Sequence, residues 1–286
     1  MKLKIHHLLG CFLILAAFIP AGCGRTELPA DTRLFLVGVG PGDYDLASIR
    51  AMNVIKAADV LVCFERSQEK YRDFIRGKEV IAVPHGFWHH YGKKPSDLKG
   101  DEAKKEMEIA PKRDAFIRQV RDLTARDRIV AVLDSGDPMV YGPWAWILEE
   151  FEDLNPSVVP GISCFNAAHA AIKKSPTITK STKSVILSAN DWPGKTDTIG
   201  RLARHGSSMA LFTMRAEFDF FINRLKAGYP LDTPVAIVMH AGYKDKEKVI
   251  TGTLRTITDI AGKTKLPFEY MIYIGDFITY RQKQDR

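Results

Sequence analysis

Short apolar segments that alternate with helical stretches constrain the fold of this chain more than any other feature of its sequence. A run of three to six mostly apolar residues bounded by turn formers is typical of a buried strand, and hydrophobic residues at helical spacing lie between these runs. In the first half this pattern predicts strands at Arg33–Gly38, Val60–Phe64, Glu79–Val83, Arg128–Leu133 and Ser157–Val159, and helices at Leu46–Ala58, Asp101–Arg126 and Trp144–Phe151. Strands that alternate with helices predict a parallel α/β sheet.

A second alternating series follows in the second half. Strands are expected at Ser184–Ala189, Ser208–Thr213, Val235–His240 and Glu269–Ile274, with helices at Thr196–His205, Glu217–Ala227 and Leu254–Ala261. The stretch 173–183 is rich in Lys, Ser, Thr and Pro and has no apolar periodicity, so we expect the boundary there. The predicted organisation is a leader over 1–23, a linker over 24–32, an N-terminal α/β domain over 33–175 and a C-terminal α/β domain over 176–286.

Three glycine-bearing turns follow three of the predicted strands of the first half. They are Gly38-Val39-Gly40-Pro41-Gly42-Asp43, Asp134-Ser135-Gly136-Asp137-Pro138-Met139-Val140-Tyr141-Gly142 and Val158-Val159-Pro160-Gly161-Ile162-Ser163. Glycine lets the backbone adopt positive φ and approach a ligand closely, and open α/β sheets bind ligands at the carboxyl ends of their strands. The first turn is no dinucleotide fingerprint, because Asp43 replaces its third glycine. A tight turn with Asp43 or Asp45 as helix N-cap is the alternative interpretation.

Together these motifs resemble the tetrapyrrole (corrin/porphyrin) methylases, a family that uses S-adenosylmethionine. The resemblance extends from about Arg33 to Ile278 and includes Ala58-Asp59-Val60, Val249-Ile250-Thr251-Gly252-Thr253-Leu254 and Tyr273-Ile274-Gly275-Asp276. It implies two α/β domains of the tetrapyrrole methylase type, with the cofactor in the cleft between them. Carried over by motif, the cofactor contacts implied for this chain are Pro41, Gly136, Asp137, Val140, Ser163, Cys164, Met214 and Gly242.

Methyl transfer from a sulfonium needs mainly in-line placement and exclusion of water, since the leaving group is already activated. In the uroporphyrinogen-III branch of the family the Asp of Ala-Asp-Val is assigned as a base, which makes Asp59 the candidate catalytic residue here. A cap of the helix-to-strand turn is the competing interpretation of Asp59, just as a turn contact competes for Asp137. The lysine that partners the base in that branch has no match, while Tyr141-Gly142 resembles the later precorrin methylases.

The loop His85-Gly86-Phe87-Trp88-His89-His90-Tyr91 follows the third predicted strand and concentrates histidines and aromatics. Its flat faces and titratable rings suit a planar molecule fringed with carboxylates, so His85, His89 and His90 are candidate substrate-binding residues. A solvated loop with aromatics packed beneath it is the alternative. No resident metal site is expected, because the sequence has no CxxC pair and Cys63 and Cys164 suit small buried residues.

The first 23 residues resemble a bacterial lipoprotein signal. Lys2 and Lys4 precede the apolar stretch Leu8–Ile19, which at 12 residues is shorter than the ~20 needed to span a bilayer, and Ala21-Gly22 precede Cys23. This predicts lipidation at Cys23 and an exported, membrane-anchored protein, although Pro20 departs from the pattern. A soluble exported protein and an uncleaved anchor are the alternatives.

Charge and composition limit the partners. After the leader the chain has 39 basic and 34 acidic residues, a net of +5 without a dense basic block, which argues against nucleic acid. The expected partners are therefore a tetrapyrrole-like small molecule, a membrane surface reached through the lipid and, by resemblance, a second copy in a homodimer. Two other functions stay open: an exported non-catalytic tetrapyrrole- or nucleoside-binding protein, and a methylase of another acceptor such as a peptide or RNA.

Overall fold

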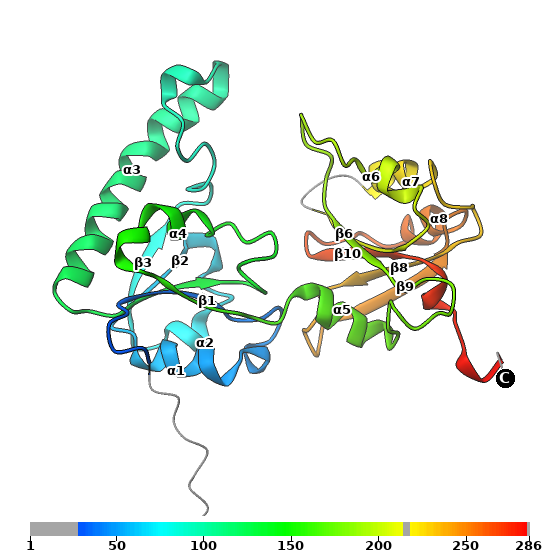
Figure 1. Ribbon diagram of the computed structural model, residues 1–286, viewed down its shortest axis with the longest axis horizontal. Coiled ribbons are helices and arrows are strands. Elements are labelled where there is room, and N and C mark those ends of the chain that lie inside the picture. The colour runs from blue at the N-terminus through cyan, green and yellow to red at the C-terminus, as the bar shows by residue number, and fades with distance from the viewer. Residues whose placement is uncertain (1–27, 214–217, 285–286) are drawn as a thin grey trace, which may run out of the picture.

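The computed structural model describes residues 28–213 and 218–284, and they form two α/β units that lie side by side (Figure 1). The first unit contains a parallel sheet of order β3-β2-β4-β1-β5. Its strands are β1 (Leu34–Gly38), β2 (Val60–Phe64), β3 (Glu79–Val83), β4 (Val130–Asp134) and β5 (Ser157–Val159). Its helices are α1 (Ile49–Ala57), α2 (Arg72–Ile75), α3 (Gly100–Ala125) and α4 (Trp146–Glu150). The predicted parallel sheet is confirmed, with each predicted strand within two residues of its observed bounds.

Alternate residues of the first sheet face different helices. Leu36, Val62 and Val132 join the cluster with Phe116 of α3 and Ile147 of α4. On the opposite face, the neighbouring strand residues Val37, Leu61 and Leu133 join a cluster with residues of α1 and α2: Ala51, Val54 and Phe74. Because successive side chains of a strand point to opposite faces, a sheet covered by helices on both sides reads as continuous apolar runs. Because helices cover both faces of the sheet, its carboxyl edge is the part that faces the second unit.

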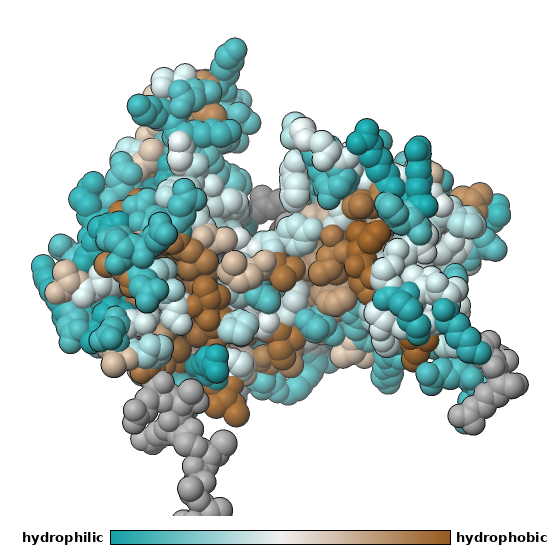
Figure 2. Space-filling view, in the orientation of Figure 1, coloured by the Kyte–Doolittle hydropathy of each residue, from teal (hydrophilic) through white to brown (hydrophobic). Residues whose placement is uncertain are grey.

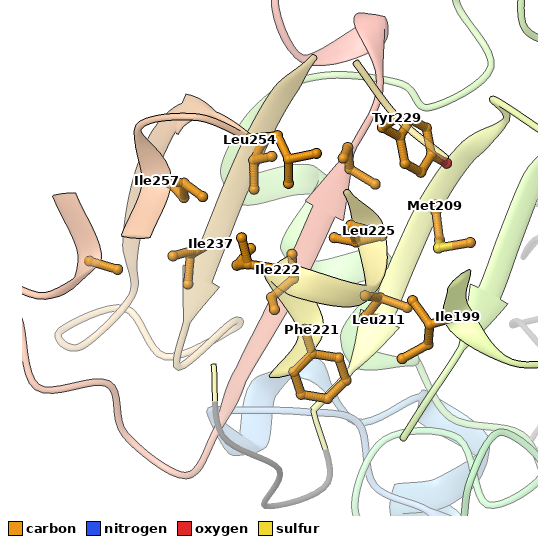
Figure 3. Packing of buried hydrophobic residues seen from close by; sticks show 14 of the residues in the cluster. Ile199, Met209, Leu211, Phe221, Ile222, Leu225, Tyr229, Ile237, Leu254 and Ile257 are labelled. Atoms are coloured by element: carbon orange, nitrogen blue, oxygen red, sulfur yellow. The ribbon is translucent and has the colours of Figure 1, made fainter. Parts of the chain in front are cut away.

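The second unit has a mixed sheet, which the simple alternation of strands and helices did not anticipate. Its order is β6-β7-β10-β8-β9, in which β6 and β7 are parallel and the other neighbours are antiparallel. The strands are β6 (Val185–Ser188), β7 (Ser208–Phe212), β8 (Pro234–Met239), β9 (Lys248–Thr253) and β10 (Tyr270–Ile274). The helices are α5 (Cys164–Ile172), α6 (Ile199–Ala203), α7 (Phe218–Leu225) and α8 (Ile257–Ala261). One face of this sheet packs under α6, α7 and α8 (Figure 3).

The chain crosses from one unit to the other earlier than the predicted boundary at 175. Helix α5 packs on the second sheet, where Ala168 is buried with Ala210, Val238 and Tyr273. The crossing therefore falls in the turn after β5. The stretch 173–183 looked like a boundary because it lacks apolar periodicity, but it is a surface connection within the second unit.

Among residues 28–213 and 218–284, no helix has both the length and the apolar character required to cross a bilayer. The proposed leader, Cys23 and the first residues of the linker lie outside the described residues.

Candidate active site

The three glycine-bearing turns meet at the carboxyl edge of the first sheet, as the sequence predicts. Gly40 and Gly136 form an antiparallel bridge in which Gly136 N donates to Gly40 O at 2.9 Å and Gly40 N donates to Gly136 O at 3.3 Å. The third turn is packed just as closely, because a Cβ on Gly161 would lie 2.0 Å from Gly136 O. Gly161 must therefore be glycine for this contact, and Gly40 and Gly136 have φ of +76° and +78°, which also favour glycine. The three turns form one continuous floor.

The second unit is joined to this floor through another pair of glycines. A Cβ on Gly42 would lie 2.2 Å from the carbonyl oxygen of Gly242, and Asp43 N donates to that oxygen at 3.0 Å. The Asp43 carboxylate accepts from Lys244 N at 2.9 Å, so it ties the units together. The N-cap of α1 is instead Ser48, whose hydroxyl accepts from Ala51 N. Asp43 is the N-cap residue of the short 3-10 turn Tyr44–Leu46, but its side chain makes no cap hydrogen bond there, so the expected cap by Asp43 or Asp45 is not found at α1.

A cavity of about 190 Å³ lies between the two units, and in the view of Figure 2 the surface is notched between them. The first unit contributes Pro41, Gly42, Lys70 and Ser135 to its lining, and α5 contributes Cys164. The second unit contributes Phe212, Thr213, Val238, His240, Ala241, Tyr243, Phe268, Glu269 and Tyr270. Apolar walls with a few polar and charged groups are the ordinary composition of a small-molecule site.

Several expected cofactor contacts gather at or next to this cavity. Pro41 and Cys164 line it, Gly242 packs against Gly42 beside it, and Gly136 lies directly after the lining residue Ser135. The other expected cofactor contacts among the described residues do not line the cavity. Ser163 is the N-cap of α5, Val140 packs against the apolar cluster of the second unit, and the Asp137 carboxylate accepts from Met139 N at 2.9 Å. Asp137 thus makes the turn contact that the sequence left as its alternative. Met214 lies outside the described residues.

Asp59 is not brought to the site. It precedes β2 at the amino end of the strand, is exposed, and its carboxylate accepts a 2.7 Å hydrogen bond from Ile129 N. The five residues of β2 separate it from the carboxyl edge by about 17 Å at ~3.3 Å per residue. The structure therefore corrects the catalytic interpretation of Asp59 in favour of the cap at the start of the strand.

The histidine and aromatic loop lines a second, larger groove of about 670 Å³. Its lining residues are Arg66, His85, Trp88, His89, Tyr141, Gly142, Pro143, Trp192 and Phe268. His85 and His89 thus face the groove as expected, whereas His90 is not among its lining residues and has a φ of 58°. Phe268 lines both this groove and the smaller cavity, so the two adjoin at that ring.

A buried arginine of α3 fixes the backbone of this loop. Arg113 donates to Phe87 O at 2.9 Å and to His89 O at 3.3 Å, and its guanidinium pairs with Glu106, about two turns earlier on the helix. The side chains of Arg113 and Glu106 are 6% and 1% exposed. The alternative interpretation of the loop, with aromatics packed beneath it, is confirmed for Phe87, which is buried, and for Trp88 and Tyr91, which pack against the same cluster. It is incomplete, because a buried ion pair also positions the loop.

Three titratable groups at or near the cavity have shifted pKa values. Burial raises the pKa of Asp134, at the end of β4, to about 7, although the backbone N–H groups of Ser135 and Trp144 oppose the shift. Burial also lowers the pKa of Lys70 and raises that of Glu269, but their mutual attraction, together with Tyr243 beside Lys70 and His240 beside Glu269, outweighs both effects. The net pKa of Lys70 lies above its usual value and that of Glu269 below, so both are charged at neutral pH.

Lys70, Glu269 and His240 were missed by sequence reasoning. Lys70 stands in the charged stretch after β2, and Glu269 directly precedes β10, so neither is marked by a motif. In the part of the chain that the structure covers, no group of three or more His, Cys, Asp or Glu side chains is arranged to hold a metal ion.

A model of the family Tetrapyrrole (Corrin/Porphyrin) Methylases matches residues 33–258. The chain belongs to this family. It is 27% identical over 257 residues to the cobalt-precorrin-4 C(11)-methyltransferase of Methanocaldococcus jannaschii, covering 86% of this chain and 88% of that protein. It is 25% identical over 255 residues to the uroporphyrinogen-III C-methyltransferase of Priestia megaterium, covering 87% of this chain and 99% of that protein.

Solved structures agree on the fold of this methylase family member. The X-ray structure of a cobalt precorrin-4 methyltransferase superposes with a TM-score of 0.68 at 24% identity, covering 89% of this chain and 99% of that one. The uroporphyrin-III C-methyltransferase of Thermus thermophilus, complexed with S-adenosylhomocysteine, superposes with a TM-score of 0.62 at 19% identity. This chain is accordingly an S-adenosylmethionine-dependent methyltransferase of the tetrapyrrole methylase family.

Proposed function

We propose that this enzyme methylates a precorrin-type tetrapyrrole held in the aromatic groove, with S-adenosylmethionine in the adjoining cavity. The observation that carries the proposal is that the two hollows share Phe268. A methyl donor in one is thereby adjacent to a flat acceptor in the other. Relatives named for precorrin-4 methylation support this acceptor class.

The residues present fit the cofactor. Phe212, Val238 and Cys164 offer apolar walls for a nucleoside, while Lys70 and Glu269 offer charges for an amino-acid end. When bound, S-adenosylmethionine supplies an electrophilic methyl group whose leaving group needs no protonation. The chain's own residues act by placement: the floor of Gly40, Gly136 and Gly161 fixes the turns, and the walls of the cleft exclude water.

On the acceptor side, the loop provides stacking and charge. The rings of His85 and Trp88 lie 4.5 Å apart edge to face, and both line the groove with His89. These flat faces suit a macrocycle, and histidine that is cationic below about pH 6.5 suits its carboxylates. If the macrocycle carried a metal, the imidazole of His85 or His89 would supply a ligand for it.

Binding and transfer are tested separately. S-adenosylhomocysteine should bind the purified protein in calorimetric titration, and tetrapyrroles should show a shifted Soret band that His85→Ala or His89→Ala weakens. His90→Ala serves as the matched control in the same loop. Radiolabelled methyl transfer to a precorrin-type acceptor is the decisive result. Binding of tetrapyrrole without any transfer would favour the exported non-catalytic binding protein, and transfer only to peptide or RNA would overturn the acceptor.

We further propose that the protein is exported and held on a membrane by lipid at Cys23. The support is the sequence alone: two lysines, an apolar stretch of 12 residues and Ala21-Gly22-Cys23. Cys23→Ser should leave the precursor unprocessed or release the protein from the membrane fraction. An intact Met1 on a soluble protein, seen by mass spectrometry, would contradict the proposal. The same purified material should sediment as a homodimer, the assembly that the family resemblance implies.

A further inference from the structure

An ion pair crosses the cavity from one unit to the other. Lys70 Nζ, from the segment after β2, lies 3.0 Å from Glu269 Oε1, just before β10. His240 Nδ1 lies 3.5 Å from the other Glu269 oxygen, and the Lys70 ammonium lies 5.6 Å from the centroid of the Tyr243 ring. The two side chains are only 24% and 41% exposed, so their charges are partly withdrawn from water.

These charges are concentrated at one side of an otherwise neutral cavity. Among the described residues that line it, Lys70 and Glu269 are the only Lys, Arg, Asp or Glu side chains. Lys70, Tyr243 and Gly42 also border a polar hollow outside, which is lined by Asp43, Asp45, Glu69 and Lys246 among others. Lys70 therefore lies where the apolar cavity meets the charged outer surface, and Glu269 lies on the side of the cavity.

A ligand that is apolar and aromatic at one end and zwitterionic at the other matches this division. The amino-acid end of S-adenosylmethionine carries an ammonium and a carboxylate on the same carbon. Both groups lose solvation on entering a cavity unless the protein supplies charged partners. A lysine can pair with the ligand's carboxylate, and a glutamate that faces the lysine can pair with the ligand's ammonium. When these two new pairs replace the lysine–glutamate pair, the net charge of the site stays balanced.

We propose that Lys70 binds the carboxylate and Glu269 the ammonium of the cofactor's amino-acid end, with the present ion pair opening to admit them. The pair thereby distinguishes S-adenosylmethionine and its demethylated product from nucleosides that lack this end. His240 and Tyr243 position the two charges from the second unit. The proposal rests on the cofactor assignment and adds the residues that make the site selective.

Isothermal titration with two ligands tests it. S-adenosylhomocysteine has the amino-acid end, whereas 5′-methylthioadenosine keeps the nucleoside and the thioether without it. The wild type should bind the first more tightly. Lys70→Met and Glu269→Gln should each weaken S-adenosylhomocysteine by about tenfold or more, the worth of a charge-assisted hydrogen bond, and leave 5′-methylthioadenosine unchanged.

The control is Lys246→Met. Lys246 lies 5.4 Å from the same Tyr243 ring but borders only the outer hollow, so both affinities should stay at the wild-type value. An equal loss for both ligands in the Lys70 and Glu269 variants would overturn the proposal, because it would mean that the pair only holds the cleft in shape. Equal wild-type affinity for the two ligands would overturn it as well. Binding of neither ligand by the wild type would refute the cofactor assignment itself.

Discussion

Replacing Arg113 by methionine should destabilise the enzyme and release the loop that lines the aromatic groove. The side chain of Glu106 is 1% exposed, so the substitution leaves a carboxylate buried without its partner. Removal of one member of a buried ion pair costs about 3–5 kcal/mol, most of it the penalty of the charge left behind. The carbonyls of Phe87 and His89 lose their donor at the same time.

The measurement is urea unfolding at neutral pH, followed by tryptophan fluorescence. Arg113→Met should lower the free energy of unfolding by about 3–5 kcal/mol. The double variant Glu106→Gln/Arg113→Met should recover most of this loss, because no charge remains buried. Arg118→Met, at an exposed position of the same helix, is the control and should change stability by less than about 0.5 kcal/mol.

Tetrapyrrole binding by the loop is a second measurement, which a change in global stability alone would not explain. In the double variant stability returns, but the two loop carbonyls still lack Arg113, so tetrapyrrole binding should stay weak. If Arg113→Met lowers the free energy of unfolding by less than about 1 kcal/mol, the reasoning is refuted, because Glu106 would not then be left as a buried charge without a partner. Full recovery of tetrapyrrole binding in the double variant would refute the role of Arg113 in holding the loop.

The remaining predictions concern the glycine contacts and the buried carboxyl. Gly42→Ala should push the two units apart and abolish binding of S-adenosylhomocysteine in calorimetry, because the new Cβ would lie 2.2 Å from Gly242 O. The control Gly77→Ala, at φ +72° with nothing within 4 Å, should bind normally. Normal binding by both variants would contradict the close contact. The folded state keeps a proton on Asp134 up to about pH 7, whereas the unfolded chain releases it near pH 3.8. Stability should therefore fall by up to roughly 4 kcal/mol as the pH rises through this window, and Asp134→Asn should flatten the profile in urea melts. An unchanged slope in that variant would mean that another group titrates there.

Local features of the chain were well determined by the sequence. The bounds of Val60–Phe64, Glu79–Val83 and Ser157–Val159 agree with the structure, since each is a short apolar run between turn formers. The meeting of Gly40, Gly136 and Gly161 was also predictable, because the carboxyl ends of parallel strands share one edge. The composition of the loop predicted that His85 and His89 would line a binding groove, which they do, but it also predicted this of His90, which does not line it.

The tertiary structure alone decided which segments face one another across the cleft. Periodicity reports which side of an element is buried but not what buries it. Residues 164–172, for which no helix was predicted, were therefore included in the N-terminal domain, and the second sheet was not recognised as mixed. Asp59 matched a family motif in sequence, yet the direction of its strand carries it away from the site. Lys70 and Glu269 lie 199 residues apart and belong to no motif. Their pairing exists only because the two sheets are packed together, and no local pattern of residues encodes that packing.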